Sequence, residues 1–334
     1  MKNLYSLLIS FLISFVSGNV IAQSCCSGGS GSPIAGGTSQ GVLEDRQAEV
    51  SMNFQYTNSK KFLTGDKESK NFLDNFNSKY LYTRLAYGVS SKLTLSLETG
   101  YYFNKTQIGL NKRDTLSNSG FGDFIIFPRY SVYTHNTETS RTEVTLGLGL
   151  KLPIGKYLDS SVVYTNAQGK DFYTPMPPAV MPTTGSNDFI FYGFGYRGYP
   201  EKKFRIFANV LYVRKGWNQL GQKFGDYAGI GIFAGKTFRR KLGVTLQLKG
   251  ESIGKMDYDK NVDMLATYNL DVTATGGKRL LFVPQISYSY KTLSAYVLSE
   301  IPIYQYVNGT AIASQHLFTF GLSYRFLVYR EANG

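Results

Sequence analysis

The sequence is poor in the side chains that most often carry chemistry. It has 2 histidines, 2 cysteines and 1 tryptophan among 334 residues. The two cysteines, Cys25 and Cys26, are neighbours, so they cannot join distant parts of the chain. The histidines, His135 and His316, fall on opposite sides of the membrane in the strand map given below, whereas a hydrolase needs its nucleophile and base side by side. We therefore expect no enzyme, and nothing in the sequence indicates a cofactor.

Long apolar runs are missing after the N-terminus. None approaches the roughly 20 apolar residues that a membrane helix needs. The beginning of the chain instead has the features of a signal peptide: Lys2, an apolar run from Leu4 to Val16, and small residues up to Ala22. We expect residues 1–22 to be removed on export.

Residues 23–46 are predicted to form a flexible periplasmic arm, because their first part is rich in glycine and serine. The favoured interpretation of Cys25 and Cys26 is a cysteine pair without a role in this arm. Two alternatives stay open. The sequence Ala22-Gln23-Ser24-Cys25 faintly resembles a lipoprotein cleavage site, which would lead to lipidation of Cys25. A thiolate pair is also a ligand for a soft metal such as Cu(I).

The formal net charge is +13. The cations are spread along the chain without a basic stripe or a base-stacking motif, so we do not expect a nucleic-acid partner. The charge fits contact with outer-membrane lipid and lipopolysaccharide, or a lumen that favours anions.

Tyrosine (26) and phenylalanine (23) are abundant, and apolar and polar residues alternate along many segments. Side chains of a strand change face at every residue, so such alternation gives one apolar and one polar face. It predicts twelve strands, an even number as in bacterial single-chain barrels. The predicted strands are residues 47–57, 79–89, 92–103, 122–133, 141–152, 187–198, 203–214, 225–237, 242–251, 278–290, 293–304 and 314–327.

The connections between these strands alternate between long and short. This is the pattern of an all-β, transmembrane, antiparallel up-and-down β-barrel with periplasmic termini and long extracellular loops. We therefore expect a barrel over residues 47–328 in the bacterial outer membrane, followed by a C-terminal tail, residues 329–334. The longest loop, Pro153 to Ser186, has two interpretations: a solvent-exposed cap, or a segment that folds inward and narrows the lumen.

Residue parity separates the two faces of each strand. Met52, Leu148 and Phe320 belong to apolar stripes expected to face lipid. The opposite parity predicts the charged residues that line the lumen: Glu49, Arg84, Glu98, Arg129, Glu143, Lys151, Arg205, Lys249, Arg279, Glu300 and Arg325.

Some of these charges are expected to pair. Glu49 and Arg325 lie on the first and last strands, which must meet to close the barrel, and Arg129 and Glu143 are assigned facing positions across a turn. Three cations have no carboxylate evident on a neighbouring strand and are candidates for contact with an anionic solute. These are Arg205, Lys249 and Arg279.

Several motifs resemble a known family. They are Gly120-Phe121-Gly122-Asp123, the segment from Leu146 to Gly155, and the closing Phe320-Gly321-Leu322-Ser323-Tyr324-Arg325-Phe326. The chain is similar to outer-membrane channels grouped with the phenol-degradation meta-pathway (MetA) transporter family, in the form found in Bacteroidota. The family's Pro-Thr-Gly is here Pro153-Ile154-Gly155. The resemblance implies a barrel that conducts a small solute.

The sequence thus predicts an outer-membrane channel for a small solute, apolar or aromatic if the family's name is a guide, or anionic if the lumen charges decide. A barrel of twelve strands is expected to leave a narrow or plugged pore. The alternative is a non-transporting barrel that acts as a subunit or anchor of a larger outer-membrane complex, because fold does not fix function.

Overall fold

The computed structural model describes residues 41–112, 115–239, 241–268 and 270–328. The predicted signal peptide, Cys25 and Cys26, the arm up to residue 40 and the tail from residue 329 lie outside these ranges. Within them, no helix is long and apolar enough to cross a membrane.

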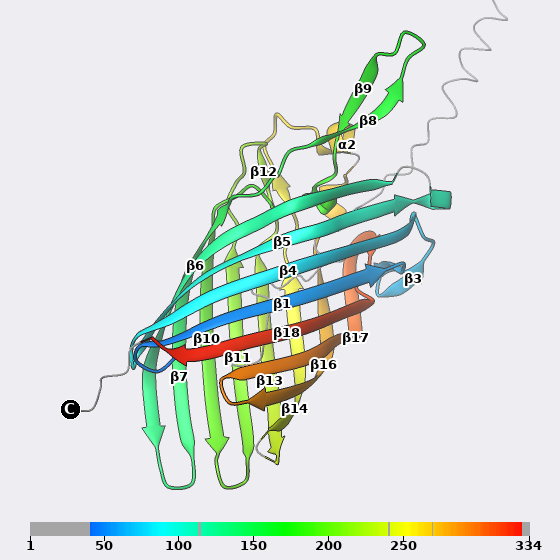
Figure 1. Cartoon of the computed structure of the whole chain (residues 1–334). Helices are drawn as coiled ribbons and strands as arrows, with labels where there is room; N and C mark the ends of the chain where they lie inside the picture. Colours follow the sequence, from blue (N-terminus) through cyan, green and yellow to red (C-terminus); the bar gives the residue numbers. More distant parts are fainter. Residues whose placement is uncertain (1–40, 113–114, 240, 269, 329–334) are drawn as a thin grey trace, which may run out of the picture.

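Twelve long strands form a closed antiparallel barrel (Figure 1). Each strand pairs with its neighbours in sequence, and β1 pairs with β18, so no barrel strand is left with a free edge. A closed ladder satisfies the backbone hydrogen bonds that lipid cannot. The predicted up-and-down barrel is confirmed. Its strands are β1 (Gln47–Ser59), β4 (Leu73–Ser90), β5 (Leu93–Gly109), β6 (Leu116–Asn136), β7 (Arg141–Pro153), β10 (Asp188–Tyr199), β11 (Phe204–Arg214), β13 (Tyr227–Phe238), β14 (Leu242–Ile253), β16 (Gly277–Tyr290), β17 (Leu293–Ile312) and β18 (His316–Leu327).

The two ends of the barrel differ. One end, which we call the turn end, has the short connections, the first residue of β1 and the last residue of β18. The other, the loop end, has the long connections, although β17 and β18 are joined there by residues 313–315 alone, and in Figure 1 the β8–β9 hairpin projects from it. The short elements of the loop end are β2 (Phe62–Gly65), β3 (Lys67–Ser69), η1 (Leu110–Lys112), β8 (Ser160–Thr165), β9 (Asp171–Pro175), η2 (Pro178–Val180), β12 (Gln222–Lys223), β15 (Asp257–Tyr258), α2 (Met264–Tyr268) and η3 (Val272–Ala274).

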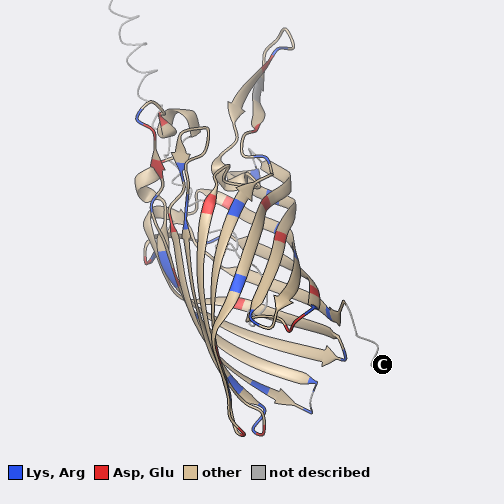
Figure 2. Ribbon diagram, turned by 90° about the vertical axis from the view of Figure 1, so that its left-hand side faces the viewer, with Lys and Arg blue, Asp and Glu red and all other residues tan. Residues whose placement is uncertain are grey.

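Burial along the strands is the reverse of that in a soluble protein. On β1, the polar residues Ser51, Asn53 and Gln55 are buried, while Met52 is 48% and Phe54 37% exposed. The same holds around the barrel, where large apolar side chains point outward and the strand ribbons in Figure 2 are mostly free of charge. An apolar outer surface of this extent needs lipid to cover it.

Candidate functional site

The lumen has two contrasting walls. One wall, formed by β18 and β1 and called here the polar wall, presents only polar or charged side chains from residue 49 to residue 57 on β1. Asn53, midway along this stretch, accepts a hydrogen bond at Oδ1 from the hydroxyl of Tyr296 on β17. The lumen-facing residues of the polar wall are Glu49, Ser51, Asn53, Gln55, Thr57, Thr319, Ser323 and Arg325.

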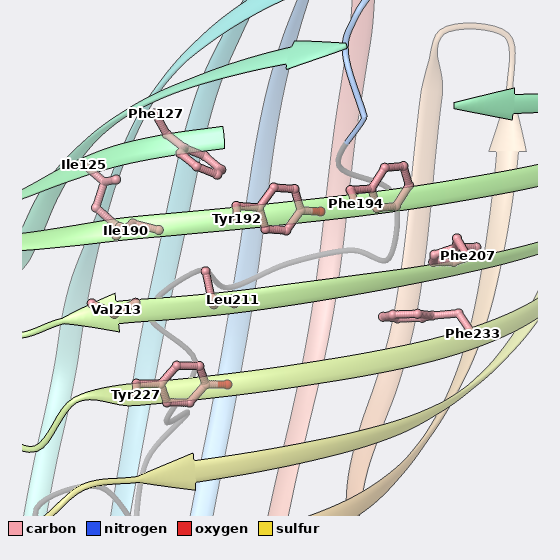
Figure 3. Packing of buried hydrophobic residues seen from close by; sticks show 10 residues of the cluster. All are labelled: Ile125, Phe127, Ile190, Tyr192, Phe194, Phe207, Leu211, Val213, Tyr227 and Phe233. Atoms are coloured by element: carbon pink, nitrogen blue, oxygen red, sulfur yellow. The ribbon is translucent and has the colours of Figure 1, made fainter. Parts of the chain in front are cut away.

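The facing wall is aromatic. Strands β6, β10, β11 and β13 contribute one buried cluster, shown in Figure 3. Within it, the rings of Phe207 and Phe233 stack with centroids 4.4 Å apart and planes at 15°, and Phe127 meets Tyr192 edge-on at 5.6 Å. We call this cluster the aromatic wall; it consists of Ile125, Phe127, Ile190, Tyr192, Phe194, Phe207, Leu211, Val213, Tyr227 and Phe233.

Both walls border a cavity of about 470 Å³ at the turn end. Ser51 and Asn53 line it on one side, and Phe194 and Phe207 on the other. Five arginines and three glutamates also line it, which gives an excess of two positive charges. The cavity therefore offers an apolar surface, a polar surface and cationic groups to one small molecule.

Residues 41–46, which precede β1, lie against the wall at the turn end. The backbone N–H of Val42 donates to Glu143 Oε1 at 3.3 Å, and that of Leu43 donates to Thr94 Oγ1 at 2.7 Å. Gly88 permits this close approach, because a Cβ there would collide with the carbonyl oxygen of Glu44. This segment narrows the lumen from the turn end.

Near the loop end, Lys151 is the centre of a buried charge cluster. Its Nζ lies 2.8 Å from both Asp123 Oδ2 and Asp188 Oδ2, and Lys215 Nζ lies 2.9 Å from Asp188 Oδ2. Lys151 is only 1% exposed. The two carboxylates and the two ammonium groups cancel in charge. We therefore assign this cluster a structural role, in which it links β6, β7 and β10.

A second charge cluster joins β14, β16 and β17. Lys249 Nζ lies 2.8 Å from Glu251 Oε1 and 3.0 Å from Glu300 Oε1, and Arg279 donates to the other oxygen of Glu251. Tyr227 donates to Glu251 Oε1 at 2.6 Å. The Glu251 carboxylate thus satisfies three donors from three strands.

The long loop between β7 and β10 folds into the lumen, which resolves the two interpretations of its sequence. Residues 177–183 are buried, and Val180 is 0% exposed. Ala179 and Val180 pack on Phe76 of β4 and Ile312 of β17, while Lys105 Nζ of β5 donates to Met181 O at 2.8 Å. A segment that touches strands spread around the barrel narrows its lumen.

The predicted lumen residues all lie on barrel strands. Seven of the eleven are buried, namely Glu49, Arg84, Glu98, Arg129, Glu143, Lys151 and Arg279. Glu49 accepts hydrogen bonds from Arg325, as expected, and also from Arg84. Glu98 accepts one from Tyr82.

Two detailed expectations were wrong. Arg129 does not face Glu143: its register partner on β7 is Gly147, and its Nη1 donates to Gly41 O at 3.0 Å, whereas Glu143 binds Arg141. Lys249 and Arg279 are not free of carboxylates, because both bind Glu251. The cause is Glu251 itself, two residues from Lys249 and therefore on the same face of β14.

Sequence reasoning missed the acidic partners and the aromatic wall. The odd–even rule that predicted the lumen-facing cations also places three acidic residues on the lumen face: Asp123, Asp188 and Glu251. The aromatic wall was harder to see because both faces of β10 are apolar: Ile190, Tyr192 and Phe194 point inward, and Phe189 and Phe191 point outward. Among the described residues, no group of three or more acidic, histidine or cysteine side chains is placed to hold a metal ion.

Comparisons with known proteins show the fold. No protein-family description matches the sequence, and no curated protein does. The COG4313 outer membrane channel from Pseudomonas putida F1 superposes with a TM-score of 0.63 at 10% identity, over 88% of this chain and 100% of that one. A KdgM porin (TM-score 0.39, 9% identity, 83% and 99% covered) and a Pseudomonas aeruginosa FadL homologue (0.42, 8%, 86% and 91%) are more distant.

The protein is a bacterial outer-membrane β-barrel. The closed twelve-strand barrel, its apolar outer surface and the superposition at 0.63 agree on this. The turn end, where β1 begins and β18 ends, is the periplasmic end, and the loop end is extracellular.

Proposed function

We propose that the barrel is a channel for small solutes that have an apolar or aromatic body and a polar end. The observation that carries the proposal is the cavity of about 470 Å³, bordered by the aromatic wall and the polar wall together. A solute of this kind can rest its body on Phe194 and Phe207 while its polar end meets Ser51 and Asn53. A uniformly polar lumen would give such a molecule no apolar contact.

The narrowing at both ends sets the size of the solute. Residues 177–183 occupy the extracellular half of the lumen, and residues 41–46 lie across part of the periplasmic mouth. Such a pore is suited to single small molecules. We infer that the chain is exported through residues 1–22 and acts without catalysis. Its membership of the phenol-degradation meta-pathway family in Bacteroidota stays a prediction.

Single-channel recording of the purified barrel tests the proposal. The wild-type protein is expected to give a small, steady ion current. Val180→Asp places a carboxylate among Phe76, Ile312 and Ala179, which drives the loop out of the lumen and should raise the current. Gln168→Asp, on the exposed tip between β8 and β9, is the matched control and should leave it unchanged.

An electrically silent wild-type barrel that also stays silent as Val180→Asp would contradict the channel. That result would favour the alternative, in which the barrel serves as a subunit or anchor of a larger complex.

A further inference from the structure

The charges of the turn-end cavity do not balance locally. Of its glutamates, Glu49 binds Arg84 and Arg325, and Glu143 binds Arg141. The third, Glu44, is exposed on the rim. Two cavity arginines remain, Arg129 and Arg205, and among the described residues neither forms an ion pair.

Arg129 is held in an unusual state. It is 2% exposed, its Nη1 has only the neutral carbonyl oxygen of Gly41 as a partner, and its Nε has none in the described part of the chain. Its guanidinium carbon lies 5.7 Å from the centre of the Phe127 ring. Glu98 and Glu49 act on its charge from beyond ion-pair distance, and a buried charge without a direct counter-ion is costly. A carboxylate is a stronger acceptor for a guanidinium than a carbonyl is, so an anion would lower that cost.

Arg205 lies on the same cavity, closer to the mouth. It is the second residue of β11, partly exposed, and it lines the cavity together with Phe207, two residues further along the same face. An anion that enters from the turn end therefore meets Arg205 near the rim and Arg129 deeper inside, in a cavity that Phe194 and Phe207 also line.

We propose that Arg205 binds the carboxylate of a small aromatic or apolar acid whose body rests on Phe194 and Phe207, and that Arg129 is a second anion-binding position deeper in the same cavity. This rests on the proposed channel and names its solute class as organic monoanions. The arginine fixes the charged end, and the aromatic wall selects for the apolar body. Neither group alone would distinguish such an acid from inorganic anions or from neutral aromatic compounds.

Calorimetric titration of the purified full-length barrel tests the site with three probes. 4-Phenylbutyrate has both parts, 4-phenylbutan-1-ol lacks the charge, and butyrate lacks the ring. We expect 4-phenylbutyrate to bind about tenfold or more tightly than either of the others, because one charge-assisted contact or one buried ring is worth at least that factor. Equal binding of the acid and the alcohol, or of the acid and butyrate, would overturn the proposed class.

Arg205→Gln and Arg197→Gln form a matched pair. Arg197 is exposed on the outward face of β10, and its register partner Ile206 is the residue next to Arg205, so both variants remove one positive charge at the same height. Arg205→Gln should weaken 4-phenylbutyrate about tenfold and leave 4-phenylbutan-1-ol unchanged, while Arg197→Gln should change neither. Equal effects of the two variants would refute the site. Folding of each is checked by its heat-dependent shift in gel electrophoresis.

Failure of the site is separable from failure of the channel. If the barrel conducts but binds 4-phenylbutan-1-ol as tightly as 4-phenylbutyrate, the channel stands and the anion site falls. If it binds the acid but is silent in bilayers in every variant, the site stands and the channel falls.

Discussion

The two walls of the lumen are built from strands with the same periodicity, but they differ in how clearly the sequence reveals their inward faces. On the polar wall, every inward residue from Glu49 to Thr57 is polar and every outward one from Val50 to Tyr56 is apolar, so the sequence alone reveals the face. On the aromatic wall, both faces of β10 are apolar and only the register distinguishes them. The alternation of side chains along a strand identifies the lipid-facing residues. It does not predict whether the lumen-facing residues are polar or aromatic.

The two walls also differ in how they interact with water. Water covers the polar wall well, whereas the packed rings of the aromatic wall exclude it. A molecule that replaces water along the aromatic wall while keeping hydrogen bonds to the polar wall gains from both surfaces. This asymmetry is the basis of the proposed preference for amphipathic solutes over sugars and over pure hydrocarbons.

The largest effect is expected from breaking the ionic support between the walls. Glu251→Gln removes the carboxylate that Arg279 binds and leaves Lys249 with Glu300 alone, and we expect a loss of about 3–5 kcal/mol in the free energy of unfolding, the usual cost of removing one partner of a buried pair. Urea unfolding followed by circular dichroism measures it. Glu138→Gln, exposed in a short turn, is the control; equal midpoints for the two variants would show that the cluster contributes nothing.

A smaller effect on assembly is expected when arginine is placed on the lipid face of β18 rather than on its lumen face. Leu322 is 38% exposed in the middle of β18, whereas Ser323 lines the cavity. Arginine at a lipid-facing position costs about 2–4 kcal/mol. Leu322→Arg should therefore reduce the folded fraction in the outer membrane much more than Ser323→Arg. If both variants assemble to the same level, the faces of β18 have been assigned incorrectly.

The smallest loss of stability is expected on the aromatic wall, because its side chains already border an open cavity. Phe207→Ala removes the ring stacked on Phe233, and we expect it to cost less than about 3 kcal/mol, the lower limit for this change in a closed core. It should nevertheless raise the ion current, because the cavity grows. Phe191→Ala, on the lipid face of β10, should leave the current unchanged. A current raised by both would assign the effect to general loosening.

The sequence was enough to predict the strand number, the side-chain parity and the pairing of Glu49 with Arg325. These follow from the period of two and from the need to close the barrel. Parity also places Glu251 beside Lys249, but the sequence was not enough to assign partners to Arg129 and Arg279, because partners on other strands of a sheared barrel depend on register and on the reach of long side chains. The inward fold of residues 177–183 depends on contacts with Phe76 and Ile312, more than a hundred residues away on either side.

The most direct test of the two-walled lumen is the block of ion current by neutral solutes of similar size. In planar bilayers, 3-phenylpropan-1-ol should reduce the current through the wild-type barrel, whereas 1,2,6-hexanetriol, which has no ring and carries three hydroxyl groups, should reduce it far less. The double variant Phe207→Ala/Phe233→Ala should lose most of the block by the aromatic alcohol. Equal block by the two solutes, or a block that the double variant keeps in full, would contradict the account.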